Sequence, residues 1–243
     1  MTRRCCLFSL CALGVLMFIG CSDLPGKPHP GPEVPRPDSV LEFSTLYQQN
    51  CSGCHGAEGR GGAAIALANP VYLAIADDAT LRQVTAAGMK GTSMPGFAQS
   101  AGGMLTDQQI DALVQGMRTN WGKKGSLGGV ELPPYSAPAG DAQRGADSYK
   151  TYCAGCHGTE KGSSKAGSII DGSYLGLVSD QALRTIVITG RPELGGPDWR
   201  SNVPRRPMSS QEIADIVAWL SAQRPQYPGQ PYPSPPPATG GNP

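Results

Sequence analysis

Cysteine and histidine are the residues of this chain whose types and spacing could do chemistry. Four cysteines stand in two short motifs, CSGCH at residues 51–55 and CAGCH at residues 153–157. Both match C-x-x-C-H, in which two thiols can bond to the vinyl groups of one porphyrin while the histidine lies beneath the iron. The motifs therefore predict two covalent haem c groups, each with one histidine as an axial ligand. The residues are Cys51, Cys54 and His55 for the first haem, and Cys153, Cys156 and His157 for the second.

Other uses of these cysteines fit less well. A thioredoxin-like C-x-x-C would need a βαβ setting, and neither motif is flanked by strand-like alternation. A four-cysteine zinc site would have to bring together pairs that lie 102 residues apart, and it would leave a histidine unused beside each pair. A disulfide within each pair would close a loop too small to add much stability.

Charge and proline content bound the class of protein. The 20 lysines and arginines are balanced by 19 acidic residues, so the chain has no basic field for nucleic acid. Of its 23 prolines, six fall in residues 21–40 and eight in residues 225–243. We expect the first of these segments to be an extended tether, at about 3.1 Å per residue, and the second to be a disordered tail.

The N-terminus has the pattern of an export signal. Arg3 and Arg4 precede an uncharged, mostly apolar run at residues 5–20, which is short for a membrane span. The run ends in FIGC, which resembles the lipobox of bacterial lipoproteins, with Phe18 where leucine is usual. This resemblance implies cleavage before Cys21 and lipidation of its thiol. An ordinary signal peptide cut nearby and an uncleaved anchor are the alternatives, and the twin arginine lacks the rest of the signal for folded-protein export.

The chain repeats itself at an offset of 102 residues, which predicts two copies of one unit. The matched pairs include Tyr47 and Tyr149, Tyr72 and Tyr174, Asp78 and Asp180, Arg82 and Arg184, Gly88 and Gly190, and Pro95 and Pro197. After a one-residue insertion, TDQQI at residues 106–110 matches SSQEI at residues 209–213. The expected organisation is a signal at 1–20, a tether at 21–40, a first domain at 41–121, a linker at 122–140, a second domain at 141–224 and a tail at 225–243.

Both copies have the pattern of an all-α unit. A short helix is expected before each motif, a middle helix over residues 78–87 and 180–189, and an amphipathic helix at the end of each unit. Apolar residues follow the i, i+3, i+4, i+7 rule at Ile110, Leu113, Val114 and Met117, and at Ile213, Ile216, Val217 and Leu220. The pairs Thr106 with Gln109 and Ser209 with Glu212 predict capping boxes where these helices begin.

The two units resemble class I cytochrome c domains, an all-helical fold that wraps one covalent haem. The resemblance covers about residues 41–121 and 141–224, and it rests on YxxxCxxCHG in both copies and on MPGF in the first. In that family a methionine of the MPGF segment is the distal iron ligand, which implies Met94 for the first haem. Met89, five residues earlier, is its rival.

The second copy departs from the family at this ligand. The offset places Gly196 where the first copy has Met94, and the second half has one methionine, Met208, just before the closing helix. Leu105 aligns with Met208, which also suits a hydrophobic staple against Ile213. The second iron is therefore left with three alternatives: Met208, an open or water-bound position, or another group such as a lysine or a partner's residue.

Arginines gather in the segment expected to pass the second haem, at Arg191, Arg200, Arg205 and Arg206. Because arginine pairs bidentately with carboxylates, Arg205 is a candidate for contact with a haem propionate, and so are Arg82 and Arg184 in the middle helices. A solvated basic face for docking is the alternative interpretation.

These features predict an electron carrier rather than an enzyme. Iron held by histidine and a thioether is six-coordinate in both oxidation states, so it transfers electrons and resists the binding of a substrate. We expect a lipid-anchored dihaem cytochrome in the bacterial periplasm. Its partners would be a quinol-oxidising complex or dehydrogenase as donor and a terminal oxidase or reductase as acceptor. The alternatives are a peroxidase-like or gas-binding protein with an open second haem, and a fixed haem subunit of a respiratory complex.

Overall fold

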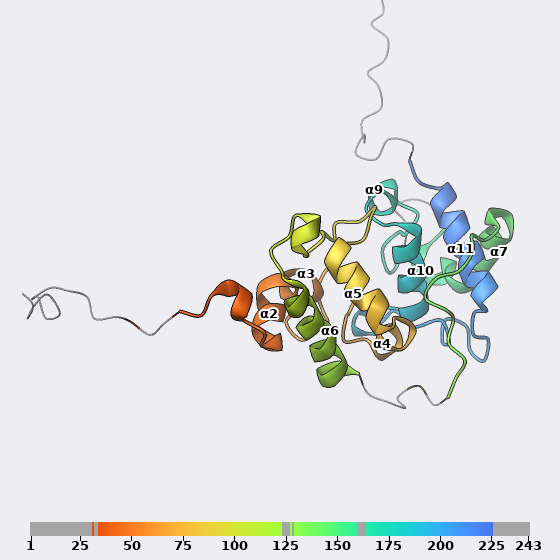
Figure 1. Cartoon of the computed structure of the whole chain (residues 1–243). Coiled ribbons are helices and arrows are strands. Elements are labelled where there is room, and N and C mark those ends of the chain that lie inside the picture. Colours follow the sequence, from red (N-terminus) through yellow and green to blue (C-terminus); the bar gives the residue numbers. More distant parts are fainter. Residues whose placement is uncertain (1–30, 32–33, 123–126, 128, 160–163, 226–243) are drawn as a thin grey trace, which may run out of the picture. The chain divides into compact units, whose positions relative to one another are not determined.

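The structure is a computed structural model that describes residues 31, 34–122, 127, 129–159 and 164–225 (Figure 1). The expected export signal, the lipidation site Cys21, most of the expected tether and all but the first residue of the expected tail lie outside the described residues. Within the described part every regular element is helical, and β pairing is limited to isolated bridges. The prediction of an all-α fold is confirmed.

The two halves of the sequence form the same succession of helices. The first half contains η1 Pro37–Ser39, α2 Phe43–Asn50, α3 Ser52–His55, α4 Pro70–Ile75, α5 Asp78–Ala87, η2 Gln99–Ala101 and α6 Asp107–Trp121. The second half contains α7 Ala142–Tyr152, α8 Ala154–His157, α9 Gly172–Gly176, α10 Asp180–Thr189, η3 Pro192–Leu194 and α11 Ser210–Ala222. The middle helices α5 and α10 have the predicted bounds. No helix lies in the described part of the expected linker.

The closing helices α6 and α11 begin at the predicted capping boxes. Thr106 and Gln109 form one box, and Ser209 and Glu212 form the other. In each box two side chains satisfy backbone N–H groups that have no partner within the helix. Both helices therefore start at equivalent residues, which fixes the register of the apolar stripe that follows.

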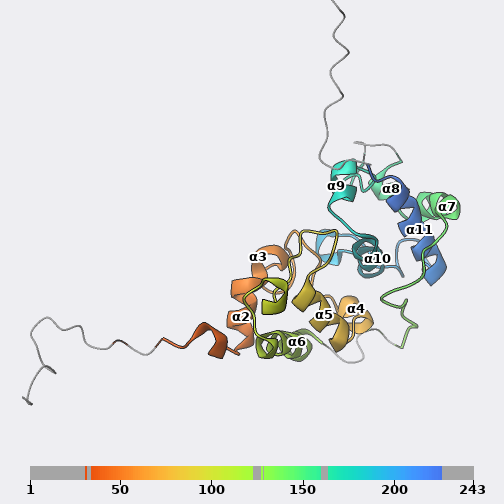
Figure 2. The ribbon, with the colours of Figure 1, turned by 45° about the horizontal axis from the view of Figure 1, so that its top comes forward.

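Each half buries a core of its own. In the second half α11 packs along α7, as Figures 1 and 2 show, and in the first half α6 packs against α2 and α5. The predicted stripes face these cores, and their buried residues are Ile110, Leu113, Val114 and Met117 in α6, and Ile213, Ile216, Val217 and Leu220 in α11. Removing this apolar surface from water is the main term that holds each closing helix in place.

The crossing of the first and last helices uses one large and one small residue in each half, with their positions exchanged. In the first half Phe43 of α2 lies against Gly116 of α6, where a Cβ would come within 2.0 Å of the ring. In the second half the glycine is Gly145 of α7 and the large residue is Trp219 of α11. The offset of the repeat aligns Gly145 with Phe43, and Trp219 with Gly116. The same volume is therefore filled from opposite helices.

Buried contacts also join the two halves. The side chain of Asn69 caps α4, and its Nδ2 donates a hydrogen bond to the carbonyl of Thr189 at 3.1 Å. Val71 of α4 is buried within the core of the second half, and Ile75 packs against that core. Arg191, which follows α10, donates through its Nη2 to the carbonyl of Gly62 at 2.7 Å. The halves are therefore held by direct packing as well as by the chain between them.

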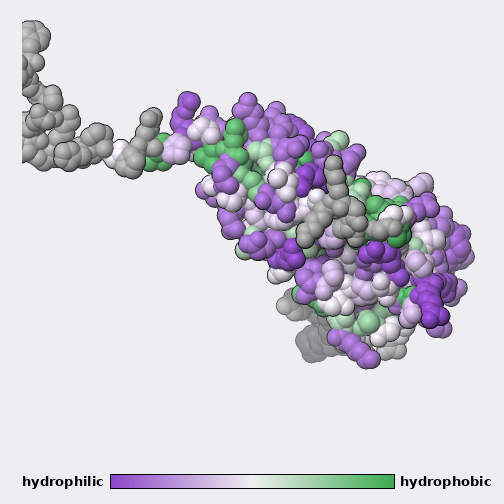
Figure 3. Space-filling model, turned by 90° about the horizontal axis from the view of Figure 1, so that it is seen from below, coloured by the Kyte–Doolittle hydropathy of each residue, from purple (hydrophilic) through white to green (hydrophobic). Residues whose placement is uncertain are grey.

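The described residues contain no helix that combines the length and the apolar character of a membrane span. The face shown in Figure 3 is largely hydrophilic, and its hydrophobic residues lie in small separate groups.

Replacing Gly145 by alanine tests the crossing of α7 and α11. The new Cβ would lie 2.0 Å from the carbonyl oxygen of Asp215 and 2.7 Å from the Cβ of Trp219, so the two helices must move apart. We expect Gly145→Ala to lower the free energy of unfolding by about 1–3 kcal/mol. This is the net change, because the steric cost should exceed the gain of about 1 kcal/mol in helix propensity that alanine brings. Denaturant unfolding followed by circular dichroism measures the change.

Two further variants make this prediction specific. Gln143→Ala, at an exposed position of the same helix, should leave stability within about 0.5 kcal/mol of the parent. The double variant Gly145→Phe with Trp219→Gly recreates the arrangement of Phe43 and Gly116, and it should recover about 0.5–3 kcal/mol relative to the sum of the single changes. Strict additivity of the two changes would contradict the exchanged packing.

Candidate haem-binding sites

Each C-x-x-C-H motif forms a short helical turn fixed by a tyrosine. The turns are α3 and α8, and they directly follow α2 and α7. The Tyr47 hydroxyl donates to the carbonyl of Gly56 at 2.7 Å, and the Tyr149 hydroxyl donates to the carbonyl of Gly158 at 2.7 Å. Both glycines have positive φ, 83° and 74°, which favours glycine at this point. The YxxxCxxCHG pattern is thus one local structure, closed by a hydrogen bond across the motif.

The two motif histidines are oriented in the same way. The Nδ1 of His55 lies 2.7 Å from the carbonyl of Ile65, and the Nδ1 of His157 lies 2.8 Å from the carbonyl of Gly167. A carbonyl only accepts hydrogen bonds, so Nδ1 must carry the proton and the lone pair belongs to Nε2. Such a hydrogen bond fixes the tautomer and ring orientation of a metal-binding histidine. Both rings therefore present Nε2 as an iron ligand.

Burial differs between the two histidines. His55 is 7 % exposed, whereas His157 is half-buried. Burial lowers the pKa of His55, the hydrogen bond to Ile65 opposes this shift, and the nearby charge of Arg191 lowers the pKa further. The His55 ring is thus kept neutral, as iron binding requires.

The four cysteines are free thiols. Burial, with a smaller effect of the second cysteine in each motif, raises the pKa of Cys51 to about 11 and that of Cys153 to about 12. Among the described residues no three His, Cys, Asp or Glu side chains group as a metal site. Two free cysteines beside an oriented histidine in each motif fit covalent haem c.

Met94 and Met89 lie in one loop between α5 and η2 in the first half. We call it the first distal loop, because the expected distal ligand of the first iron lies in it. The backbone N–H of Met89 donates to the carbonyl of Met94 at 3.2 Å, and the Thr92 hydroxyl donates to the carbonyl of Met89 at 2.7 Å. Both methionines are half-buried. The assignment of the distal ligand to Met94 stays a prediction, because the loop brings both thioethers into the same region.

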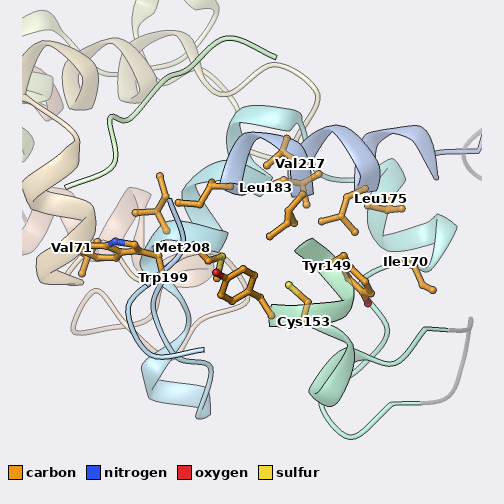
Figure 4. Close-up of a cluster of buried hydrophobic side chains, with 14 residues drawn as sticks. Val71, Tyr149, Cys153, Ile170, Leu175, Leu183, Trp199, Met208 and Val217 are labelled. Atoms are coloured by element: carbon orange, nitrogen blue, oxygen red, sulfur yellow. The ribbon is translucent and has the colours of Figure 1, made fainter. Parts of the chain in front are cut away.

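The corresponding loop of the second half, here called the second distal loop, follows α10, contains the turn η3 and has glycine at the aligned ligand position. The backbone N–H of Arg191 donates to the carbonyl of Gly196 at 3.0 Å, which repeats the hydrogen bond between Met89 and Met94. Met208 lies elsewhere, beside Trp199 in the buried core (Figure 4). The sequence-based alignment of Gly196 with Met94 therefore agrees with the backbone geometry.

The two arginines of the middle helices, Arg82 and Arg184, bond to other groups of the protein. Arg82 forms ion pairs with Asp107 at 2.9 Å and Asp111 at 2.8 Å, on the surface of α6. Arg184 is buried and donates to the carbonyl of Pro134 and to Ser210. Burial lowers its pKa, and its Nη1 has no hydrogen-bond partner among the described residues. Both arginines tie a middle helix to a closing helix, and their contact with a haem propionate stays a prediction.

Three of the four arginines between η3 and α11 or next to η3 form ion pairs with acidic side chains. Arg191 contacts Glu193 at 2.5 Å, Arg200 contacts Asp198 at 2.6 Å, and Arg206 contacts Glu212 at 3.2 Å. Arg205 is exposed and has a positive φ of 61°, which is uncommon for a residue other than glycine. Its contact with a propionate stays a prediction.

The carbonyls of Ile65 and Gly167 are the site groups that the motifs did not reveal. They lie ten residues beyond their histidines and hold the rings through backbone atoms, so side-chain type gives no signal for them. The repeat offset of 102 relates the two positions and is the one sequence signal that could have linked them.

Fold and site together define a c-type cytochrome, an electron-transfer protein with covalent haem. The family described as "Cytochrome C oxidase, cbb3-type, subunit III" matches residues 39–115 and 140–220, and the chain belongs to this family. The double match confirms the tandem cytochrome c fold predicted from the repeat.

Other comparisons are more distant. A solved chain from a reducing HAO-like protein complex of Kuenenia stuttgartiensis is similar at 16% identity, with a TM-score of 0.44. The alignment covers 79% of this chain and 100% of that one. No curated protein sequence gives a significant match.

Replacing each methionine of the first distal loop by leucine tests the ligand assignment. A change of methionine to leucine keeps the side-chain volume, so each variant should lose less than about 1.5 kcal/mol of stability. We expect Met94→Leu to abolish the charge-transfer absorption of a methionine-bound ferric haem and to lower the midpoint potential of one haem. Met89→Leu is the matched control and should leave both unchanged. The reverse result would assign the iron to Met89.

Proposed function

We propose that the chain is a dihaem electron carrier, anchored by a lipid on Cys21 at the outer side of a bacterial cytoplasmic membrane. The observation that carries this proposal is the duplicated turn, in which each C-x-x-C-H motif has a histidine oriented by a backbone carbonyl. Two such turns in one chain support two haems. Each haem, when bound, supplies a centre that takes up and releases one electron.

The residues around each centre keep the protein rigid while its charge changes. The Tyr47 and Tyr149 hydroxyls close the motif turns, and the hydrogen bonds from His55 and His157 hold the imidazoles in one orientation. A thioether from Met94 on the first iron would favour the ferrous state and raise the potential. Since little has to move, electron transfer needs little reorganisation.

Packing between the halves supports exchange of electrons within one molecule. The hydrogen bond from Asn69 to Thr189 and the burial of Val71 in the second core fix α4 against the second half. Arg191 reaches from the second distal loop to Gly62, in the loop that follows the first haem motif. The two sites are thus held together by contacts that do not depend on the linker, which favours a direct step between haems.

The proposed anchor and partners rest on features of the sequence. An export signal that ends before Cys21 supports a periplasmic location with a lipid in the membrane. The Pro-rich residues 21–40 would let the folded domains search the membrane surface. We propose a quinol-oxidising complex or dehydrogenase as the donor and a terminal oxidase or reductase as the acceptor.

A fixed subunit of a respiratory complex is a second candidate. The description of the matching family names a subunit of an oxidase, which is the observation that favours it. Purification in mild detergent separates the two candidates. A carrier should be obtained without stoichiometric partners, whereas a subunit should co-purify with an oxidase or a quinol-oxidising complex in a fixed ratio.

The proposed anchor predicts the behaviour of a cysteine variant. Cys21→Ser removes the thiol that would be lipidated, so the protein should move from the membrane fraction to the soluble periplasmic fraction with its haems intact. Cys11→Ser, within the expected signal, is the matched control and should stay with the membrane. Haem staining of the two fractions and the mass of the mature chain report the result. Membrane retention of Cys21→Ser at the parental level would contradict the lipid anchor.

The haem content has its own measurement. The pyridine haemochrome assay on the purified chain should give two haems per protein. Cys153→Ser with Cys156→Ser should reduce this ratio to one and leave the first haem in place, because each half has its own core. A ratio of one in the parent chain would contradict the dihaem proposal.

A further inference from the structure

The distal loops of the two halves share one backbone hydrogen bond and carry different side chains at the ligand position. In the first half the N–H of Met89 donates to the carbonyl of Met94, and in the second half the N–H of Arg191 donates to the carbonyl of Gly196. Gly196 also donates back to Arg191 at 2.9 Å. The second loop therefore brings an α-carbon without a side chain to the place where the first loop brings a thioether.

Met208 is built into the core at the place that leucine fills in the first half. Its backbone N–H donates to the carbonyl of Trp199 at 2.9 Å, just as the N–H of Leu105 donates to the carbonyl of Phe97 at 2.8 Å. The exposures agree as well, 4 % for Met208 and 5 % for Leu105. The capping box of α11 begins at the next residue, which holds the backbone of Met208 in place. To bind iron, this side chain would have to leave the core.

The rest of the second half offers no other methionine or histidine as a ligand. Residues 122–243 contain no methionine besides Met208 and no histidine besides His157. The nearest charged side chain to Gly196 is that of Arg191, whose guanidinium contacts Glu193 and the carbonyl of Gly62. Arginine stays protonated in proteins and has no lone pair for a metal.

We propose that the second haem iron binds a small neutral diatomic molecule on the side of Gly196. This inference rests on the proposed function, since it requires the second haem to be present. A neutral ligand is favoured over an anion because Trp199, three residues beyond Gly196, belongs with Met208 to a cluster of buried apolar side chains (Figure 4).

Carbon monoxide added to the reduced, fully loaded protein is the direct probe. We expect one carbon monoxide per two haems, seen as a shift of half of the Soret absorption and as high-spin ferrous haem before the addition. Haem content and reversible reduction are measured on the same sample. A protein that carries two reducible haems and binds no carbon monoxide therefore overturns this inference and leaves the proposed function standing.

Three variants locate the binding position. Gly196→Met places a thioether where the first half has Met94, and it should reduce carbon monoxide binding at least tenfold. A Cβ at this residue would lie 3.3 Å from the backbone nitrogen of Arg191 and 3.5 Å from its Cβ, so a small adjustment accommodates it. Met94→Leu should raise the stoichiometry from one to two.

Met208→Leu tests the rival ligand directly and should fold, because Leu105 fills the equivalent place. It should leave the spectrum and the stoichiometry of carbon monoxide binding unchanged. If the parent protein binds none and Met208→Leu binds one equivalent, Met208 is the ligand and the inference is wrong. Retention of full binding by a folded Gly196→Met protein would equally contradict the assigned position.

Discussion

The hydrogen bond from a histidine Nδ1 to a backbone carbonyl is the constraint on which each half depends. It ties the C-x-x-C-H turn to the loop ten residues further on, through Ile65 in one half and Gly167 in the other. The tyrosine hydroxyl closes the same turn from the preceding helix. Together these bonds fix the turn and the direction of Nε2, so the position of the expected iron ligand follows from backbone geometry.

Around this shared haem-binding turn the two halves differ at residues whose substitution leaves the helices in the same order. The helix crossing is filled by Phe43 against Gly116 in one half, and by Trp219 against Gly145 in the other. The middle-helix arginine meets two aspartates in the first half, whereas in the second it meets a serine hydroxyl and carbonyls of the linker. In both halves the crossing is filled and the arginine still links the middle helix to the closing helix, so the same succession of helices forms.

The exchange of methionine for glycine in the distal loop is of another kind, because the one methionine of the second half, Met208, lies in the core instead. One backbone hydrogen bond of the loop is kept, while Gly196 brings no side chain to the aligned ligand position. The core residue Met208 is committed to packing. On our proposal, one haem of the duplicated unit would transfer electrons and the other would bind a ligand.

The sequence by itself determined the fold class, the cofactor chemistry and the helices, because these depend on local patterns. The C-x-x-C-H spacing, the capping boxes and the apolar stripes each act within a few residues, and the 102-residue offset shows that they occur twice. The tertiary structure alone decided the partners of Arg82 and Arg184, the carbonyls that orient His55 and His157, and the contact of Asn69 with the second half. Each depends on atoms far apart in the chain or on backbone groups, which side-chain type does not specify.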